Sequence, residues 1–139
     1  MEREYFKALE DKPEGYQIDF NDFIERLSFN EDGLIPCIAQ QFDTKEVLMM
    51  AWMNRASLLE TIETGQVCYW SRSRQSFWRK GESSGHRQTL VKMTADCDGD
   101  TLLAYVDQKG AACHTYRRDC FYFELASDSV KITSDPGKS

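Results

Sequence analysis

Residues 34–53, with the sequence LIPCIAQQFDTKEVLMMAWM, carry the pattern that decides the fold. Apolar residues dominate residues 34–42 and 46–53, and the polar run Asp43-Thr44-Lys45 between them suits a hairpin connection. We therefore predict two neighbouring antiparallel strands. A helix is expected to follow over residues 54–65, because Asn54 is a favourable N-cap and Gly65 a favourable C-terminal stop.

Upstream of this hairpin, apolar residues are spaced as on one face of a short helix. These residues are Phe20, Phe23, Ile24 and Leu27, and Asp19 precedes them as a possible cap. Downstream, strand patterns cover residues 66–72, 76–80, 86–96, 101–108 and 121–125.

This order of elements predicts an α+β domain with one or two helices and a largely antiparallel sheet that forms a small barrel-like core. Residues 17–126 are expected to make a single domain. A polar lead-in over residues 1–16 precedes it, and a flexible polar tail over residues 127–139 follows it.

The composition excludes some classes of function. A net charge of −6 and the lack of a basic stripe argue against nucleic-acid binding. The sequence has no apolar run long enough to cross a membrane, and its N-terminus has no apolar signal region, so we expect a cytoplasmic protein. In that compartment its five cysteines would be reduced, available for metal ligation, catalysis or burial.

The segment Asp96-Cys97-Asp98-Gly99-Asp100 concentrates potential metal ligands. If it is extended, Asp96, Asp98 and Asp100 project from one side and Cys97 from the other. Carboxylate oxygens suit Mg²⁺, whereas a thiolate suits Zn²⁺. The pattern thus predicts two different metal preferences within five residues.

Two more cysteines, Cys113 and Cys120, flank a polar run that begins with His114. Together with Cys97 they would give zinc three thiolates and leave a fourth position for water, whose pKa zinc lowers to about 7. His114 is then a candidate general acid or base. Taken singly, each cysteine is better explained by burial, and the aspartates are equally well explained by a solvated turn.

Residues 71–80, which lie between the first strands and the candidate metal ligands, are rich in basic and aromatic side chains. Arginine and serine suit phosphate oxygens, a tryptophan ring suits a base, and the polar, glycine-flanked loop over residues 82–86 suits ligand binding. The candidate substrate contacts are Arg72, Ser73, Arg74, Trp78, Lys80 and Glu82, with His86 as a further catalytic candidate. The structural alternative is a solvated strand with aromatic core residues.

Four ordered motifs now stand together: YWSRSR at 69–74, WRKGESSGH at 78–86, DCDGD at 96–100 and ACHT at 112–115. Over residues 33–124 the chain closely resembles the phosphoribosyl-AMP cyclohydrolase family. The resemblance implies hydrolysis of the N1–C6 bond of the adenine ring in phosphoribosyl-AMP. The product is the phosphoribosylformimino-aminoimidazole carboxamide ribotide, formed in the third step of histidine biosynthesis.

The resemblance also implies cofactors and a partner. Cys97, Cys113 and Cys120 would hold Zn²⁺, which activates the attacking water, and the three aspartates of residues 96–100 would hold Mg²⁺. The family is an intertwined homodimer that shares its zinc sites between subunits. Three positions depart from the family pattern: Phe77, where leucine is common, Tyr116, where glycine is usual, and Asp119, where serine is usual.

Two other functions are open at this stage. A different zinc nucleotide deaminase would share the activated water, but the sequence has no His-x-Glu segment paired with Pro-Cys-x-x-Cys. A non-catalytic nucleotide-binding module with a structural zinc would bind nucleotide without turnover and hold its metal with four protein ligands.

Overall fold

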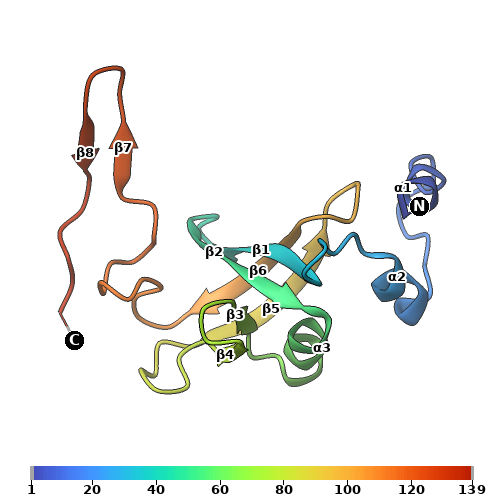
Figure 1. The fold of residues 1–139 in the computed structure, drawn as a ribbon, viewed down its shortest axis with the longest axis horizontal. Helices are drawn as coiled ribbons and strands as arrows, with labels where there is room; N and C mark the ends of the chain where they lie inside the picture. The colour runs from blue at the N-terminus through green and yellow to red at the C-terminus, as the bar shows by residue number, and fades with distance from the viewer. Residues whose placement is uncertain (1, 139) are drawn as a thin grey trace.

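The structure is a computed structural model that describes residues 2–138 (Figure 1). Its three helices are α1 (Glu2–Lys7), α2 (Phe20–Arg26) and α3 (Arg55–Thr64). Its strands are β1 (Leu34–Gln41), β2 (Val47–Asn54), β3 (Cys68–Ser71), β4 (Ser76–Arg79), β5 (Gln88–Ala95), β6 (Leu102–Gln108), β7 (Phe123–Leu125) and β8 (Val130–Ile132). The predicted α+β class is confirmed, with three helices where one or two were expected.

Four strands form the main sheet in the order β2-β1-β6-β5. Both outer pairs are antiparallel, whereas β1 and β6 in the centre run parallel. The predicted largely antiparallel sheet is therefore confirmed, but the barrel is wrong, since β2 and β5 remain edges that do not pair. The segment next to β5 makes a single bridge, Gln66 with Thr89, before it turns into the separate β3–β4 hairpin.

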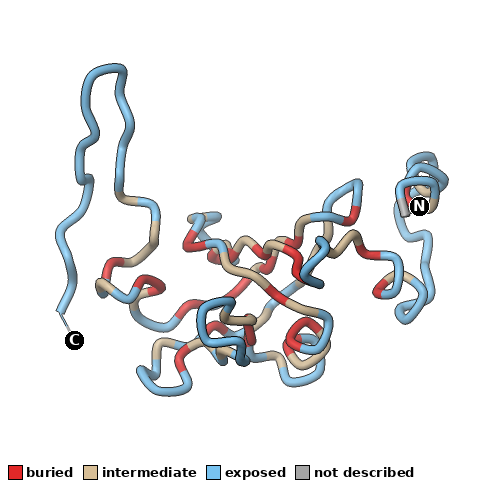
Figure 2. The backbone as a smooth tube through the Cα atoms, in the orientation of Figure 1, coloured by how far each residue is buried: buried red, intermediate tan, exposed pale blue. Residues whose placement is uncertain are grey.

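The core lies between one face of this sheet and a layer made by α3 and the β3–β4 hairpin (Figures 1 and 2). Ile35, Cys37 and Ala39 alternate along β1 and are fully buried, as a strand with one core face requires. Leu58 of α3 and Tyr69 of β3 are buried against them in the same cluster. The apolar pattern that predicted the first strand therefore also defines the floor of the core.

A chain of buried polar groups ties the strands together beneath the core. The Tyr69 hydroxyl donates to Gln88 Oε1 at 2.7 Å, and Gln88 Nε2 donates to Gln108 Oε1 at 2.8 Å. The backbone amide of Gln108 donates to Gln41 Oε1 at 2.9 Å. These bonds join β3, β5, β6 and β1 and satisfy polar atoms that would be costly to bury alone.

The predicted helix caps are confirmed. Asn54 Oδ1 accepts from the Ser57 amide, the Ser57 hydroxyl lies within 3.0 Å of the Asn54 amide, and Gly65 ends α3 with φ 75°. Asp19 Oδ2 accepts from the Asp22 amide at the start of α2. Local capping chemistry therefore sets the ends of both helices.

Both ends of the chain contain elements that the sequence pattern did not predict. Helix α1 lies within the expected lead-in and buries Phe6. Strand β8 lies within the expected flexible tail and pairs with β7 in a hairpin that projects from the body (Figure 1). Apolar side chains on this hairpin are exposed, Leu125 by 78%. Within residues 2–138 no helix is both long and apolar enough to span a membrane.

Candidate active site

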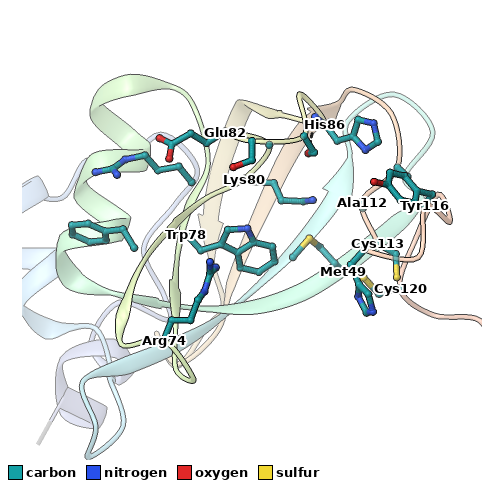
Figure 3. Close-up of a pocket in the computed structure, with 17 residues that line it drawn as sticks. Met49, Arg74, Trp78, Lys80, Glu82, His86, Ala112, Cys113, Tyr116 and Cys120 are labelled. Atoms are coloured by element: carbon teal, nitrogen blue, oxygen red, sulfur yellow. Dashed lines mark hydrogen bonds between the residues drawn. The ribbon is translucent and has the colours of Figure 1, made fainter. Parts of the chain in front are cut away.

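A cavity of about 440 Å³ opens beyond the C-terminal end of β6. Its walls come from Met49 of β2, from β4 with the loop after it, and from the loop that follows β6 (Figure 3). It gathers most of the side chains that the motifs predicted. These are Arg74, Trp78, Lys80, Glu82, His86, Cys113, His114 and Cys120.

The turn that carries the two thiols is closed by its own backbone. The Cys113 amide donates to the Arg117 carbonyl at 3.2 Å, and the Tyr116 amide donates to the Cys113 carbonyl at 3.0 Å. Tyr116 takes a left-handed φ of 65°, at the position where the resembled family usually has glycine. The Cys120 amide donates to the Leu48 carbonyl at 2.8 Å, which fixes the end of this loop to β2.

The two thiols differ in their readiness to ionise. Burial acts to raise the pKa of Cys113, but hydrogen bonds from Thr115 and from Cys120 outweigh it, so the pKa lies below the ordinary value. Burial and the neighbouring Cys113 sulfur raise the pKa of Cys120 to about 12. The pair therefore ionises first at Cys113, and a second negative charge on Cys120 is repelled by the first. A soft cation would relieve that repulsion, so this donor set fits Zn²⁺.

Two cations of the cavity are available to a ligand. Arg74 is exposed and Lys80 is half-buried, and burial lowers the pKa of Lys80. No carboxylate among residues 2–138 lies within 4 Å of either cation's nitrogen atoms. Arg79, by contrast, is bound to Glu60, with Nε 2.7 Å from Oε2. Arg74 and Lys80 therefore suit an anionic ligand.

Three labelled aromatic side chains line this cavity (Figure 3): Trp78, His86 and Tyr116. Trp78 packs against the buried Tyr69 ring with 5.4 Å between centroids. His86 meets Tyr116 edge-on, with ring centroids 5.7 Å apart. Figure 3 shows Lys80 and Met49 between Trp78 and the two cysteines. A cavity with flat rings, cations and thiols is suited to an anionic heteroaromatic ligand.

Arg72 and Ser73 do not line this cavity. They line a second one of about 610 Å³ with Trp52 and Trp70, and Trp78 contributes to both cavities. The Arg72 guanidinium lies over the Trp52 ring at 5.1 Å from its centroid. The predicted substrate contacts are thus divided between two adjacent cavities.

The acidic segment 96–100 lies at the opposite end of β6, in the loop from β5. The expectation that it is extended is wrong, because Gly99 at φ 67° turns the backbone and its amide donates to the Asp96 carbonyl. The carboxylates therefore do not separate from Cys97 by strand alternation. Instead the Asp100 backbone amide donates to Asp96 Oδ1 at 3.0 Å. The Asp96 carboxyl group, through hydrogen bonding and through its negative charge, raises the pKa of Asp100. A hard divalent cation would relieve this repulsion, so these oxygens fit Mg²⁺.

Cys97 is exposed in this loop, far from the other two predicted zinc ligands. The seven residues of β6 separate them by roughly 20 Å at the rise of an extended strand. Accordingly, nowhere in residues 2–138 do three His, Cys, Asp or Glu side chains converge as a metal site would require. One chain alone does not assemble the predicted three-thiolate set.

Sequence reasoning missed two side chains that shape the first cavity. Met49 lies within a continuous apolar run, where nothing separates a cavity-lining residue from a core residue. Tyr116 stood out as a departure from the family pattern, and its ring lines the cavity beside His86. The presence of tyrosine in place of the usual glycine was the one sequence feature that could have indicated a role for Tyr116 in the cavity.

Comparisons with known proteins agree with one another. A family model described as phosphoribosyl-AMP cyclohydrolase matches residues 49–122. A phosphoribosyl-AMP cyclohydrolase of Alcanivorax borkumensis is 56% identical over 96% of this chain and 94% of its own length. Proteins of the same name are 58% identical in Chromohalobacter salexigens, over 94% of this chain and 90% of their own length, and 64% in Magnetococcus marinus, over 79% and 85%.

Proposed function

Because the chain belongs to the phosphoribosyl-AMP cyclohydrolase family, we propose that it hydrolyses the N1–C6 bond of the adenine ring in 1-(5-phosphoribosyl)-AMP. The product is the phosphoribosylformimino-aminoimidazole carboxamide ribotide of histidine biosynthesis. The observation that carries this proposal is the cavity in which Cys113 and Cys120 face a tryptophan and available cations.

The two adjacent cavities suit a substrate with a phosphate at each end. Arg74 and Lys80 would neutralise one phosphate in the first cavity, and Arg72 with Ser73 the other in the second. Trp78 lines both cavities, where its ring would stack on the purine between the phosphates. This arrangement accounts for how a protein of net charge −6 holds a polyanion.

The separation of the thiols supports a homodimer. Cys113 and Cys120 of one copy would hold Zn²⁺ together with Cys97 of a second copy, since a single chain keeps Cys97 at the far end of β6. Bound there, zinc supplies an activated water for attack on purine C6. The outer face of the sheet, where Met50 is 44% exposed and Ile38 is half-buried, offers apolar surface to such a partner.

The same arrangement brings the aspartates to the site. Cys97 lies between Asp96 and Asp98, so a second copy that delivers Cys97 also delivers the carboxylates that would hold Mg²⁺. Asp100 adds a third carboxyl group next to Asp96, since its backbone amide donates to Asp96 Oδ1 at 3.0 Å. These groups would balance phosphate charge next to the reacting ring.

Proton transfer falls to the histidines of the cavity. His114 is exposed at the cavity wall next to Cys113, and we assign it delivery of a proton to the departing N1. The His86 ring is held between Gly110 and the Tyr116 ring, because a Cβ on Gly110 would lie 2.7 Å from His86 Cδ2. That fixed ring suits orientation of the substrate more than movement of a proton.

The test is the change in absorbance of phosphoribosyl-AMP, measured with the full-length protein before and after treatment with a chelator. We expect turnover that the chelator abolishes and added metal restores. Cys113→Ala should lose turnover, whereas Cys68→Ala, which removes a buried thiol outside the cavity, should retain it. Ammonia release would indicate a deaminase instead, and nucleotide binding without turnover would indicate a binding module.

A further inference from the structure

Helix α1 makes close contact with the acidic loop through one ring. Phe6 is 5% exposed, and its ring edge lies against Gly99 so tightly that a Cβ on Gly99 would come within 2.5 Å of Phe6 Cε2. Gly99 itself is buried, while Asp96, Cys97, Asp98 and Asp100 around it are exposed. The loop is therefore held at its backbone, and its ligand side chains extend into solvent.

A second contact from the N-terminal region reaches the same turn. The Ser28 amide donates to the Gly99 carbonyl at 2.8 Å, and the Ser28 hydroxyl donates to the Asp98 carbonyl at 3.3 Å. Ser28 follows Leu27, the C-cap of α2, so the carbonyl groups of Asp98 and Gly99 are both bound by one residue. These two bonds from Ser28 are additional to the bond within the loop, in which the Gly99 amide donates to the Asp96 carbonyl.

Phe6 is itself held in place by an aromatic cluster. Its ring meets Phe23 of α2 at 88° with centroids 5.5 Å apart, and meets Tyr5 at 5.2 Å. The Arg26 guanidinium lies over the Tyr5 ring at 5.2 Å from its centroid. Phe6 is thus held by rings from α1 and α2, although residues 10–22 of the connecting segment and of the start of α2 are exposed.

We propose that α1 and residues 23–28 are a positioning element for the acidic loop, with Phe6 as the residue that sets the Gly99 turn. This rests on the proposed function, in which Asp96, Asp98 and Asp100 hold a divalent cation. The three exposed aspartate side chains need a fixed backbone to converge on an ion, because their own packing does not orient them. Phe6 and Ser28 supply that fixed backbone without contacting the ion.

One experiment measures binding of Mn²⁺, a paramagnetic stand-in for Mg²⁺, to zinc-free full-length protein by electron paramagnetic resonance. Phe6→Ala should weaken binding about tenfold, as loss of a residue that supports metal ligands commonly does. Phe6→Leu, which keeps apolar contact, should restore most of the affinity. Phe20→Ala removes a ring that is 48% exposed and should leave the affinity unchanged.

A second readout needs no metal. Hydrogen exchange of residues 96–101 in chelator-treated protein should accelerate in Phe6→Ala, while exchange over residues 34–41 of the core stays at the wild-type rate. Unchanged exchange at 96–101 overturns the positioning proposal. If instead wild type and Asp98→Asn bind Mn²⁺ equally, the magnesium site of the proposed function fails, and the exchange result still decides whether Phe6 sets the turn.

Discussion

The Thr115 hydroxyl donates a hydrogen bond to the Cys113 sulfur at 3.0 Å, across the turn that carries His114. A sulfur held in this way has its lone pairs oriented before any metal arrives. Such supporting hydrogen bonds commonly account for 10- to 100-fold in metal affinity. Thr115 therefore belongs to the proposed zinc site although it does not ligate.

Thr115→Val keeps the shape of the side chain and removes the donor. We expect it to weaken Zn²⁺ binding by about tenfold, measured by competition with a chromophoric chelator. Thr133→Val is the matched control, because the Thr133 hydroxyl donates to the Tyr122 carbonyl on the exposed hairpin. An equal loss of affinity in both variants would show that the Cys113 hydrogen bond has no particular role.

The separation of Cys97 from Cys113 predicts complementation between inactive variants. Cys97→Ser and Cys113→Ser should each be inactive alone. After the two are unfolded together and refolded, about half the dimers are mixed and each mixed dimer has one intact site, so about a quarter of wild-type activity should return. Phosphoribosyl-AMP turnover gives the measurement.

The matched control mixes Cys113→Ser with Cys120→Ser. Both changes fall on the same loop of one chain, so a shared site remains broken in every mixed dimer and no activity should return. If the Cys97 and Cys113 variants also fail to complement, although mixed dimers form, the three thiolates do not come from two copies.

Elements with local signals were predictable from the sequence. Asn54 and Gly65 cap α3 by chemistry within a few residues, and the 34–53 hairpin follows from alternation and a polar turn. The barrel was not predictable, since closure depends on whether β2 and β5 meet, which is a long-range outcome. Helix α1 was missed because its stability comes from Phe6 packing on α2 and on the acidic loop, not from its own pattern.

The site divides in the same way. The motifs predicted which side chains line the cavity with Cys113 and Cys120. Trp78, Lys80 and His86 are close in sequence, on β4 and in the loop after it, so they reach the cavity together. The grouping of Cys97 with Cys113 overlooked the strand predicted over residues 101–108, which lies between the two cysteines and places them at its opposite ends. The alternation argument for Asp96–Asp100 failed because Gly99 turns the chain.

Tyr116 should carry backbone strain, because a side chain at φ 65° is disfavoured by about 1–2 kcal/mol. Tyr116→Ala and Tyr116→Gly both remove the ring contact with His86. The difference between their free energies of unfolding therefore reports the cost of a side chain at this φ. We expect the glycine variant to be more stable by about 1 kcal/mol in urea unfolding. Equal stabilities would mean that the turn relaxes when the ring is removed.

Gln88 joins two buried partners, so its loss should be costly. Gln88→Ala leaves the Tyr69 hydroxyl and Gln108 Oε1 without the partners they have now, at about 1–3 kcal/mol for each group. We expect a free energy of unfolding lower by about 3 kcal/mol. Gln66→Ala, at an exposed position bonded to Thr89, should change it by less than about 0.5 kcal/mol. Similar losses in both would contradict a special role for the buried chain.

Stability should fall at alkaline pH because of a thiol that takes no part in the proposed chemistry. Burial raises the pKa of Cys37 from 9.0 to about 12. Between these values the unfolded chain has released the thiol proton and the folded chain still holds it, so the unfolded state binds fewer protons. The free energy of unfolding should therefore be unaffected by this group below pH 9 and decrease by about 1.4 kcal/mol per pH unit above it.

Cys37→Ala removes this titration while keeping a small apolar side chain in the core. Cys68, whose pKa burial also raises to about 12, titrates in both proteins and cancels in the comparison. Urea unfolding under reducing conditions at pH 7, 9, 10 and 11 should show a steeper decline for wild type than for the variant, by about 1.4 kcal/mol per pH unit above pH 9. The two proteins differ by a constant offset below pH 9, since substitution of a buried side chain has its own cost. Parallel declines above pH 9 would mean that the folded protein lets Cys37 ionise, and hence that the face of β1 that carries it is open to water.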